Sequence, residues 1–96
     1  MPTRPSQNDP DRTVQWAARR AAVGGRIRQL RIERALTQEE VAHRSGVARH
    51  MLVQVELGQR GLLYERLFDI ADALDVPIVE LFESSAPSTG GGDTDV

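Results

Sequence analysis

The sequence predicts an all-α domain, and three observations lead to this prediction. Apolar residues recur at helical spacing in several segments of the 96-residue chain, and no segment shows the alternation of a strand. A Thr-Gln-Glu-Glu capping box begins one segment at Thr37, and glycines stand where two segments end, at Gly46 and Gly58. Hydrophobic residues make up 40% of the chain but only four residues are aromatic, so we expect a core of aliphatic side chains between packed helices.

The two ends of the chain differ in composition from the segment between them. Residues 1–12 place three prolines among Ser, Gln, Asn and Asp, which is typical of a flexible arm. Residues 84–96 combine Ser, Pro and a run of three glycines, which is typical of a disordered tail. We therefore expect one ordered domain over residues 13–83.

Within this domain the pattern predicts five core helices, with an additional N-terminal helical segment in front of them. The front segment, residues 13–22, is rich in Ala and Arg. Gly24 and Gly25 separate it from the first core helix, so the two segments form either two helices or one kinked helix. Pro77 suits the first position of the last helix, where no backbone N–H is needed. The core helices are expected at residues 26–34, 37–45, 48–57, 63–74 and 77–82.

Charge is unevenly distributed along the chain. The net charge of −2 combines a front part, residues 1–60, with 11 Arg and 6 acidic residues (net +5), and a rear part with 1 Arg and 8 acidic residues (net −7). Every cation is arginine, which suits bidentate contacts with phosphate and guanine, although a codon bias would give the same composition. We expect only the front part to face nucleic acid.

Several classes of function are disfavoured by what the sequence lacks. There is no cysteine, which excludes disulfides, Cys-based zinc sites and thiol chemistry. No apolar run is long enough for a bilayer and no signal peptide is recognisable, so we expect a cytoplasmic protein without a membrane partner. His43 and His50 lack an obvious third ligand, and no catalytic triad or phosphate loop is visible. We therefore expect no metal, no cofactor and no enzyme activity.

Residues 38–57 have the pattern of two helices that cross at a steep angle. Ala42 is small where the helices approach each other, and Gly46 forms a tight turn. Three apolar residues would insert the second helix into the core: Val47, Leu52 and Val55. This arrangement leaves the first turn of the second helix protruding. A protruding helix end fits the major groove of DNA, which predicts a helix-turn-helix motif.

Four stretches carry a wider resemblance: Gly25-Arg-Ile-Arg-Gln-Leu-Arg, Leu36-Thr-Gln-Glu-Glu-Val-Ala, Ser45-Gly-Val and Glu80-Leu-Phe. With these stretches the sequence closely resembles the phage repressor and Cro helix-turn-helix family, also called the xenobiotic-response-element (XRE) type. The resemblance covers about residues 23–83 and fixes residue types at many spacings. It implies a lambda-repressor-like domain of five helices, typical of bacterial transcription regulators that bind operator DNA as two-fold dimers.

The resemblance also implies DNA contacts residue by residue. Arg49, His50 and Gln54 fall on positions that contact bases, where Arg49 suits guanine and Gln54 suits adenine. Met51 is apolar where the family is often polar, and it either touches a thymine methyl group or packs against the domain. Phosphate contacts are assigned to four residues: Thr37, Gln38, Gln59 and Arg60.

Arg31 and Glu56 match a pair that forms a structural salt bridge in this family. The alternative is that Arg31 contacts a phosphate, and we favour the salt bridge. A buried pair would orient the helices more than it stabilises them, and removal of one partner would cost about 3–5 kcal/mol.

Two other features depart from the family pattern. Ala35 stands in the turn before the capping box where glycine is usual, so a positive φ there would strain the backbone by about 1 kcal/mol. Leu62, Leu63 and Tyr64 replace a polar turn. They form either an apolar self-association surface or part of the core.

The sequence thus predicts a sequence-specific regulator that binds a double-stranded DNA operator as a homodimer, with the helix at about residues 48–57 in the major groove. The alternative is a module of the same fold that binds a protein partner, because Met51, Val53 and Leu57 are apolar and the net charge is acidic. Trp16, ahead of the shared region, is expected to anchor the front segment to the core or, alternatively, to a second subunit.

Overall fold

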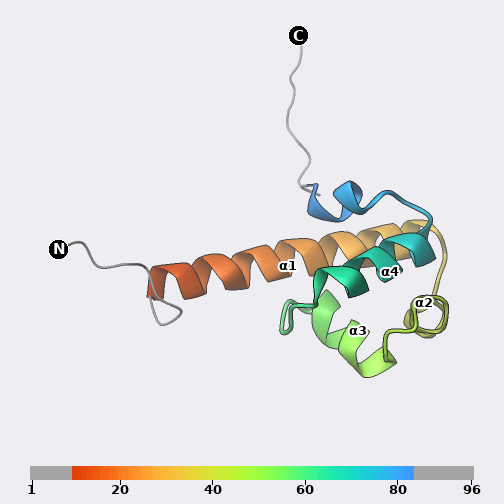
Figure 1. Cartoon of the computed structure of the whole chain (residues 1–96), viewed down its shortest axis with the longest axis horizontal. Helices are drawn as coiled ribbons and strands as arrows, with labels where there is room; N and C mark the ends of the chain where they lie inside the picture. The colour runs from red at the N-terminus through yellow and green to blue at the C-terminus, as the bar shows by residue number, and fades with distance from the viewer. Residues whose placement is uncertain (1–9, 84–96) are drawn as a thin grey trace, which may run out of the picture.

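The computed structural model describes residues 10–83, and all regular structure in this part of the chain is helical. In chain order the elements are α1 (Pro10–Glu33), α2 (Gln38–Ser45), α3 (Arg49–Glu56), α4 (Tyr64–Leu74) and the 3-10 helix η1 (Ile78–Phe82). The shorter elements gather at the C-terminal half of α1, and α3 and η1 pack directly against it (Figure 1). The N-terminal half of α1 projects beyond them.

The prediction of five core helices with a front segment is confirmed only in part. The front segment and the first core helix form the single helix α1, which is one of the two alternatives that the sequence left open, and the last element of the described residues is a 3-10 helix. Pro77 precedes η1 in an extended conformation, with φ −67° and ψ 147°, and is not its first helical residue. Residues 10–12, expected in the arm, belong to α1. The rest of the expected arm (1–9) and the expected tail (84–96) lie outside the described residues.

α1 continues through its two adjacent glycines, which lie in different surroundings. Gly24 is buried where α1 crosses α3, and a Cβ at this position would overlap the carbonyl oxygen of Val55. Gly25 faces open space, where a Cβ would meet nothing. Glycine lowers the stability of a helix by only about 1 kcal/mol per residue. The close contact that Gly24 permits between α1 and α3 outweighs this local preference.

The ends of α2 and α3 follow the sequence closely. The Thr37 hydroxyl accepts a hydrogen bond from the Glu40 backbone N–H (3.0 Å), and the Glu40 carboxylate accepts one from the Thr37 N–H (2.8 Å), which confirms the capping box. Gly46 and Gly58 have φ of 77° and 75°, the left-handed region that glycine enters without strain. Ala35 has φ 56°, so the strain expected before the capping box is present.

The core is aliphatic, as the composition predicts, and it receives residues from all five elements and the turns between them. Its members are Ile27, Leu30, Val41, Val47, Leu52, Val55, Ile70, Ala71, Ala73, Leu74, Val76 and Leu81. Trp16 is not among them, which corrects the preferred expectation for this residue. It lies on the projecting half of α1, where the guanidinium of Arg12 is 5.0 Å from its ring centroid.

Candidate nucleic-acid interface

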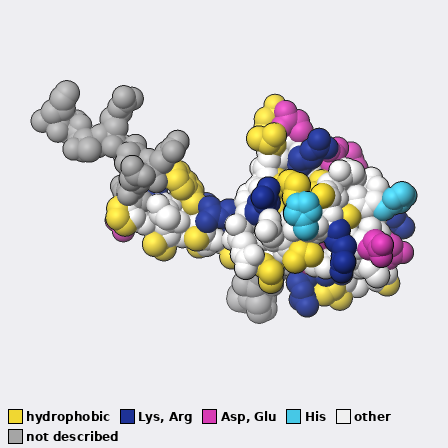
Figure 2. Space-filling model, turned by 90° about the horizontal axis from the view of Figure 1, so that it is seen from below, with side chains coloured by type: hydrophobic (Ala, Val, Ile, Leu, Met, Phe, Trp, Pro, Cys, Tyr) yellow, Lys and Arg dark blue, Asp and Glu magenta, His cyan; other side chains and the backbone are white. Residues whose placement is uncertain are grey.

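The first turn of α3 is presented at the surface while its opposite face is held in the core. Leu52 and Val55 are buried, as is Val47 in the preceding turn. The side chains of Arg49 and His50 are exposed and make no hydrogen bond or ion pair with another residue between 10 and 83. Figure 2 shows the side of the domain that carries α3, with arginine and histidine side chains spread over it.

The structure brings together the residues assigned to base contact. Arg49, His50 and Gln54 line one open hollow on α3, together with Val53. Met51 is instead half-buried and packs against the core, which favours the packing interpretation of this residue.

The turn between α3 and α4 lies beside Gln54. The Arg60 Nε donates a hydrogen bond to the Gln54 side-chain oxygen (2.9 Å), and the Gln59 backbone N–H donates to the Gln54 carbonyl (2.8 Å). The side chains of Gln59 and Arg60 are exposed. Because the bond to Gln54 uses only the Nε of Arg60, the two terminal nitrogens of its guanidinium face solvent with donors for a phosphate. The sequence did not predict this hydrogen bond between Arg60, a predicted phosphate contact, and Gln54, a predicted base contact.

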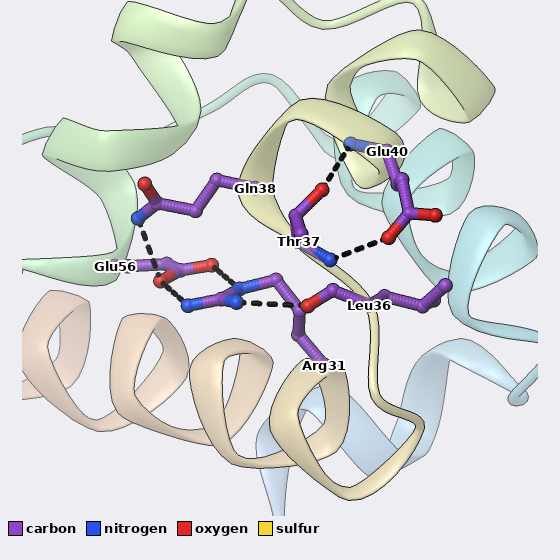
Figure 3. Close-up of polar contacts among 6 residues, drawn as sticks. All are labelled: Arg31, Leu36, Thr37, Gln38, Glu40 and Glu56. Carbon is purple, nitrogen blue, oxygen red and sulfur yellow. Dashed lines mark hydrogen bonds and ion pairs between the residues drawn. The ribbon is translucent and has the colours of Figure 1, made fainter.

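The C-terminal end of α3 is fixed by an ion pair with α1. The Arg31 Nε and Nη2 donate to the two carboxylate oxygens of Glu56 at 2.7 and 3.0 Å, and its Nη1 donates to the Leu36 carbonyl at 2.9 Å (Figure 3). The side chains are 12% and 2% exposed, respectively. The hydrogen bond to Glu56 raises the pKa of Arg31 above its ordinary value. Arg31 therefore has the structural role that we favoured, because all three of its nitrogens are engaged within the protein.

Gln38, the first residue of α2, joins the same group of polar contacts. Its amide nitrogen donates to a carboxylate oxygen of Glu56 at 3.1 Å, so one carboxylate connects α1, α2 and α3 (Figure 3). We call Arg31, Gln38 and Glu56 the polar hub. The amide nitrogen of Gln38 has a second N–H for an external acceptor. The adjacent Thr37 keeps its hydroxyl hydrogen, since the capping box uses this oxygen only as an acceptor.

Arg26 is a structural arginine that the sequence did not reveal. Its Nε donates to the Glu80 carbonyl at 2.8 Å, and its Nη2 lies 3.5 Å from the Glu80 carboxylate and 3.7 Å from that of Glu83. These contacts connect α1 to η1. The only available signal was the presence of acidic residues near the end of the domain, which does not specify a partner.

The predicted apolar patch after α3 is divided by the structure. Leu62 is half-buried and packs against the core, whereas Leu63 and Tyr64 are 72% and 67% exposed. Tyr64 forms an edge-to-face pair with the exposed Phe68, with ring centroids 6.5 Å apart. Leu62 therefore belongs with the core, and the exposed patch consists of Leu63, Tyr64 and Phe68.

Two other kinds of site were sought in the part of the chain that the structure describes. No three or more of its His, Asp and Glu side chains are grouped so that they could hold a metal ion. None of its helices combines the length and the apolar character needed to cross a membrane.

Comparison with known proteins agrees with this geometry. The helix-turn-helix family model HTH_3 matches residues 27–81. The HTH-type transcriptional regulator y4dJ of Sinorhizobium fredii is 44% identical over 62 residues, which are 65% of this chain and 80% of that protein. The repressor RstR of the cryptic phage CTXphi of Vibrio cholerae is 40% identical over 60 residues, 62% of this chain and 54% of the repressor.

A solved structure shares the fold. The restriction-modification controller protein C.AhdI from Aeromonas hydrophila superposes with a TM-score of 0.66 and 38% identity, over 68% of this chain and 98% of that one. The chain therefore belongs to the HTH_3 helix-turn-helix family and is a DNA-binding transcription regulator of the XRE type.

Proposed function

We propose that the chain recognises a two-fold operator in double-stranded DNA as a homodimer, in the cytoplasm of a bacterium and without catalysing a reaction. The observation that carries this proposal is the contrast within α3. Its first turn presents Arg49 and His50 without partners, while its last turn is fixed by the polar hub. A rigidly held helix with an exposed polar end suits insertion into the major groove.

The proposed base contacts follow from the donors and acceptors in the hollow on α3. Arg49 has no ion-pair partner among residues 10–83, so its guanidinium has paired donors for O6 and N7 of a guanine. Gln54 is oriented by Arg60, which uses one lone pair of its side-chain oxygen. This oxygen can accept a second hydrogen bond from N6 of an adenine while the amide N–H donates to N7. His50 lines the same hollow and supplies a donor or an acceptor, depending on its tautomer.

The proposed phosphate contacts surround this hollow. Gln38 and Thr37 stand at the start of α2, where the partial positive charge of the helix end favours an anion. Gln59 and Arg60 stand on the other side, in the turn after α3. These contacts would set the orientation of the domain on the duplex, while the residues in the hollow would distinguish bases.

For the dimer we propose the exposed patch of Leu63, Tyr64 and Phe68 as part of the contact between subunits. A symmetric dimer would place its two α3 helices in successive major grooves, about 34 Å apart. Sedimentation of the protein alone and with DNA tests this part. We expect two subunits per duplex, and a strict monomer under both conditions would contradict it.

The same exposed patch supports a second candidate, a module that binds a partner protein through Leu63, Tyr64 and Phe68. One binding experiment separates the two. A duplex selected from random oligonucleotides and a scrambled duplex are titrated with the wild type and with the Arg49→Ala, Gln54→Ala double variant. Operator recognition predicts a preference of at least about 1,000-fold for the selected duplex, which the folded variant loses. Weak binding without preference, unchanged in the variant, would favour the partner protein.

A further inference from the structure

We propose that the projecting half of α1 binds the DNA backbone through Arg19 and Arg20, next to the phosphates held by the turn between α3 and α4. This inference rests on the proposed operator binding and adds a contact outside the matched family segment, which begins at residue 27. It assigns a function to the part of α1 that contributes nothing to the core.

The first support is the position of the two arginines. Arg19, Arg20 and Arg60 line one cleft of about 180 Å³ between α1 and the turn after α3, with an apolar floor that includes Val23 and Leu67. At Gly61 an added Cβ would lie 3.7 Å from the Cδ of Arg20, so the turn and α1 are in close approach. A row of polar side chains thus leads from Gln54 through Arg60 to Arg20.

The second support is charge. Residues 10–23 contain three arginines and one aspartate, a net charge of +2. The side chains of Arg19 and Arg20 make no hydrogen bond or ion pair with other residues of the described range, unlike those of Arg26 and Arg31. Three arginine side chains line one cleft, so positive charge gathers beside it, and a phosphate next to these side chains would reduce their mutual repulsion.

The third support is that Arg19 and Arg20 lie near the face of the domain that carries α3. Gly58 is packed against Ala21, so the turn after α3 touches α1 within one residue of Arg20. Figure 2 shows arginine side chains at the junction between the projecting helix and the rest of the domain, on the face that also carries α3. A duplex bound to α3 and to this turn would therefore run past Arg19 and Arg20.

The chemistry of these two residues specifies backbone, not bases. Guanidinium groups pair with phosphate oxygens through parallel N–H donors. Contacts of this kind raise affinity for every sequence and make it depend on salt, but they carry no direct sequence information. Arg19 and Arg20 should therefore contribute affinity without selectivity.

The test compares the Arg19→Gln, Arg20→Gln double variant with the wild type on the selected and scrambled duplexes, at several salt concentrations. Glutamine keeps the helix propensity and removes the charges. We expect affinity for both duplexes to fall at least about tenfold, with the preference between them unchanged. The slope of log K against log salt should be smaller by about 3–4, because each of two subunits loses two phosphate contacts at about 0.9 per contact. The control is Arg66→Gln, which removes a charge from α4 and should leave the slope unchanged.

Hydroxyl-radical protection then locates the contact. The backbone positions that lose protection in the double variant should adjoin those lost in Arg60→Gln. An Arg19→Lys, Arg20→Lys variant keeps the charges and should restore the salt slope, which excludes a folding defect as the cause. Wild-type slope and protection in the glutamine variant would overturn the inference while leaving operator recognition intact.

The arginines of the cleft would also suit a free anion. Adding inorganic phosphate to the protein–DNA complex at constant ionic strength distinguishes a free phosphate ion from the DNA backbone as the ligand. Displacement of DNA from the wild type, but not from the glutamine variant, would assign the cleft to free phosphate and overturn the proposal. We expect equal, weak effects on both proteins. If instead the wild type showed no preference for any duplex, operator recognition itself would fail, whatever the salt slopes.

Discussion

The two ends of α3 differ in almost every physical respect. At the C-terminal end, Val55 and Glu56 are buried, the carboxylate of Glu56 receives hydrogen bonds from α1 and α2, and Gly58 packs against the backbone of α1. At the N-terminal end, Arg49 and His50 are exposed, and Ala48 supplies no side-chain cap. One end of an eight-residue helix is fixed from several directions, and the other is open to a ligand.

This difference shows how a small domain can position a recognition surface. The contacts that orient α3 are made by its C-terminal end and its buried face, so the exposed residues of its first turn, Arg49 and His50, are free to vary without loss of the fold. Stability and selectivity should accordingly respond to different substitutions.

Removal of the buried carboxylate should have the largest effect. Glu56→Ala leaves Arg31 buried without its partner, and we expect the free energy of unfolding to fall by about 3–5 kcal/mol in urea denaturation. Arg66→Ala is the matched control, because its pair with Asp69 is solvent-exposed and should contribute less than about 1 kcal/mol. Equal losses in the two variants would show that the hub does not fix α3.

The close contact of α1 with α3 gives the next largest effect. Gly24→Ala would force a methyl group into the Val55 carbonyl and should destabilise the domain by about 3 kcal/mol, because the backbone must move. Gly25→Ala, one residue away in open space, should stabilise it by about 0.5–1 kcal/mol through helix propensity. Thermal melts of both variants check the contrast. The same sign of change in both would contradict the proposed packing.

The smallest effect concerns the start of α2. The hydrogen bond from the Thr37 backbone N–H lowers the pKa of Glu40 below its ordinary value. A carboxyl with a lowered pKa in the folded state stabilises the fold above its unfolded pKa of about 4.3, and this contribution is lost as the pH falls through the folded pKa. Carboxyl groups titrate between about pH 6 and about pH 3. Over this range the Tm of the wild type should therefore fall more steeply than the Tm of Glu40→Gln.

Glu40→Gln keeps the cap acceptor without the charge, so the two proteins differ only in this ionisation. Parallel Tm curves across that pH range would show that Glu40 contributes nothing through its charge.

Local signals in the sequence predicted the parts of the fold that depend on neighbours in the chain. The capping box at Thr37, the left-handed turns at Gly46 and Gly58 and the aliphatic core follow from residue type and spacing. The pair of Arg31 with Glu56 was anticipated through the family resemblance and is present.

The remaining features depend on segments that are distant in sequence. Gly24 and Gly25 are indistinguishable in the local sequence. Only the close contact of Gly24 with the Val55 carbonyl shows that glycine is required at residue 24 and not at residue 25. The partners of Gln38, Gln54 and Arg26 could not be inferred either, since each bond joins residues whose proximity is set by helix packing. The 3-10 geometry of η1 was missed because five residues carry too little periodicity to distinguish it from an α-helix.

If the exposed turn of α3 distinguishes bases, a substitution in that turn should change the base preference of the protein. Binding sites selected from random duplexes with the wild type and with Arg49→Ala are compared position by position. We expect a two-fold symmetric site for the wild type. In the variant, preference for a guanine is relaxed at one position of each half-site, with about 1–3 kcal/mol of discrimination lost and the other positions unchanged. Identical site models for the two proteins would contradict it.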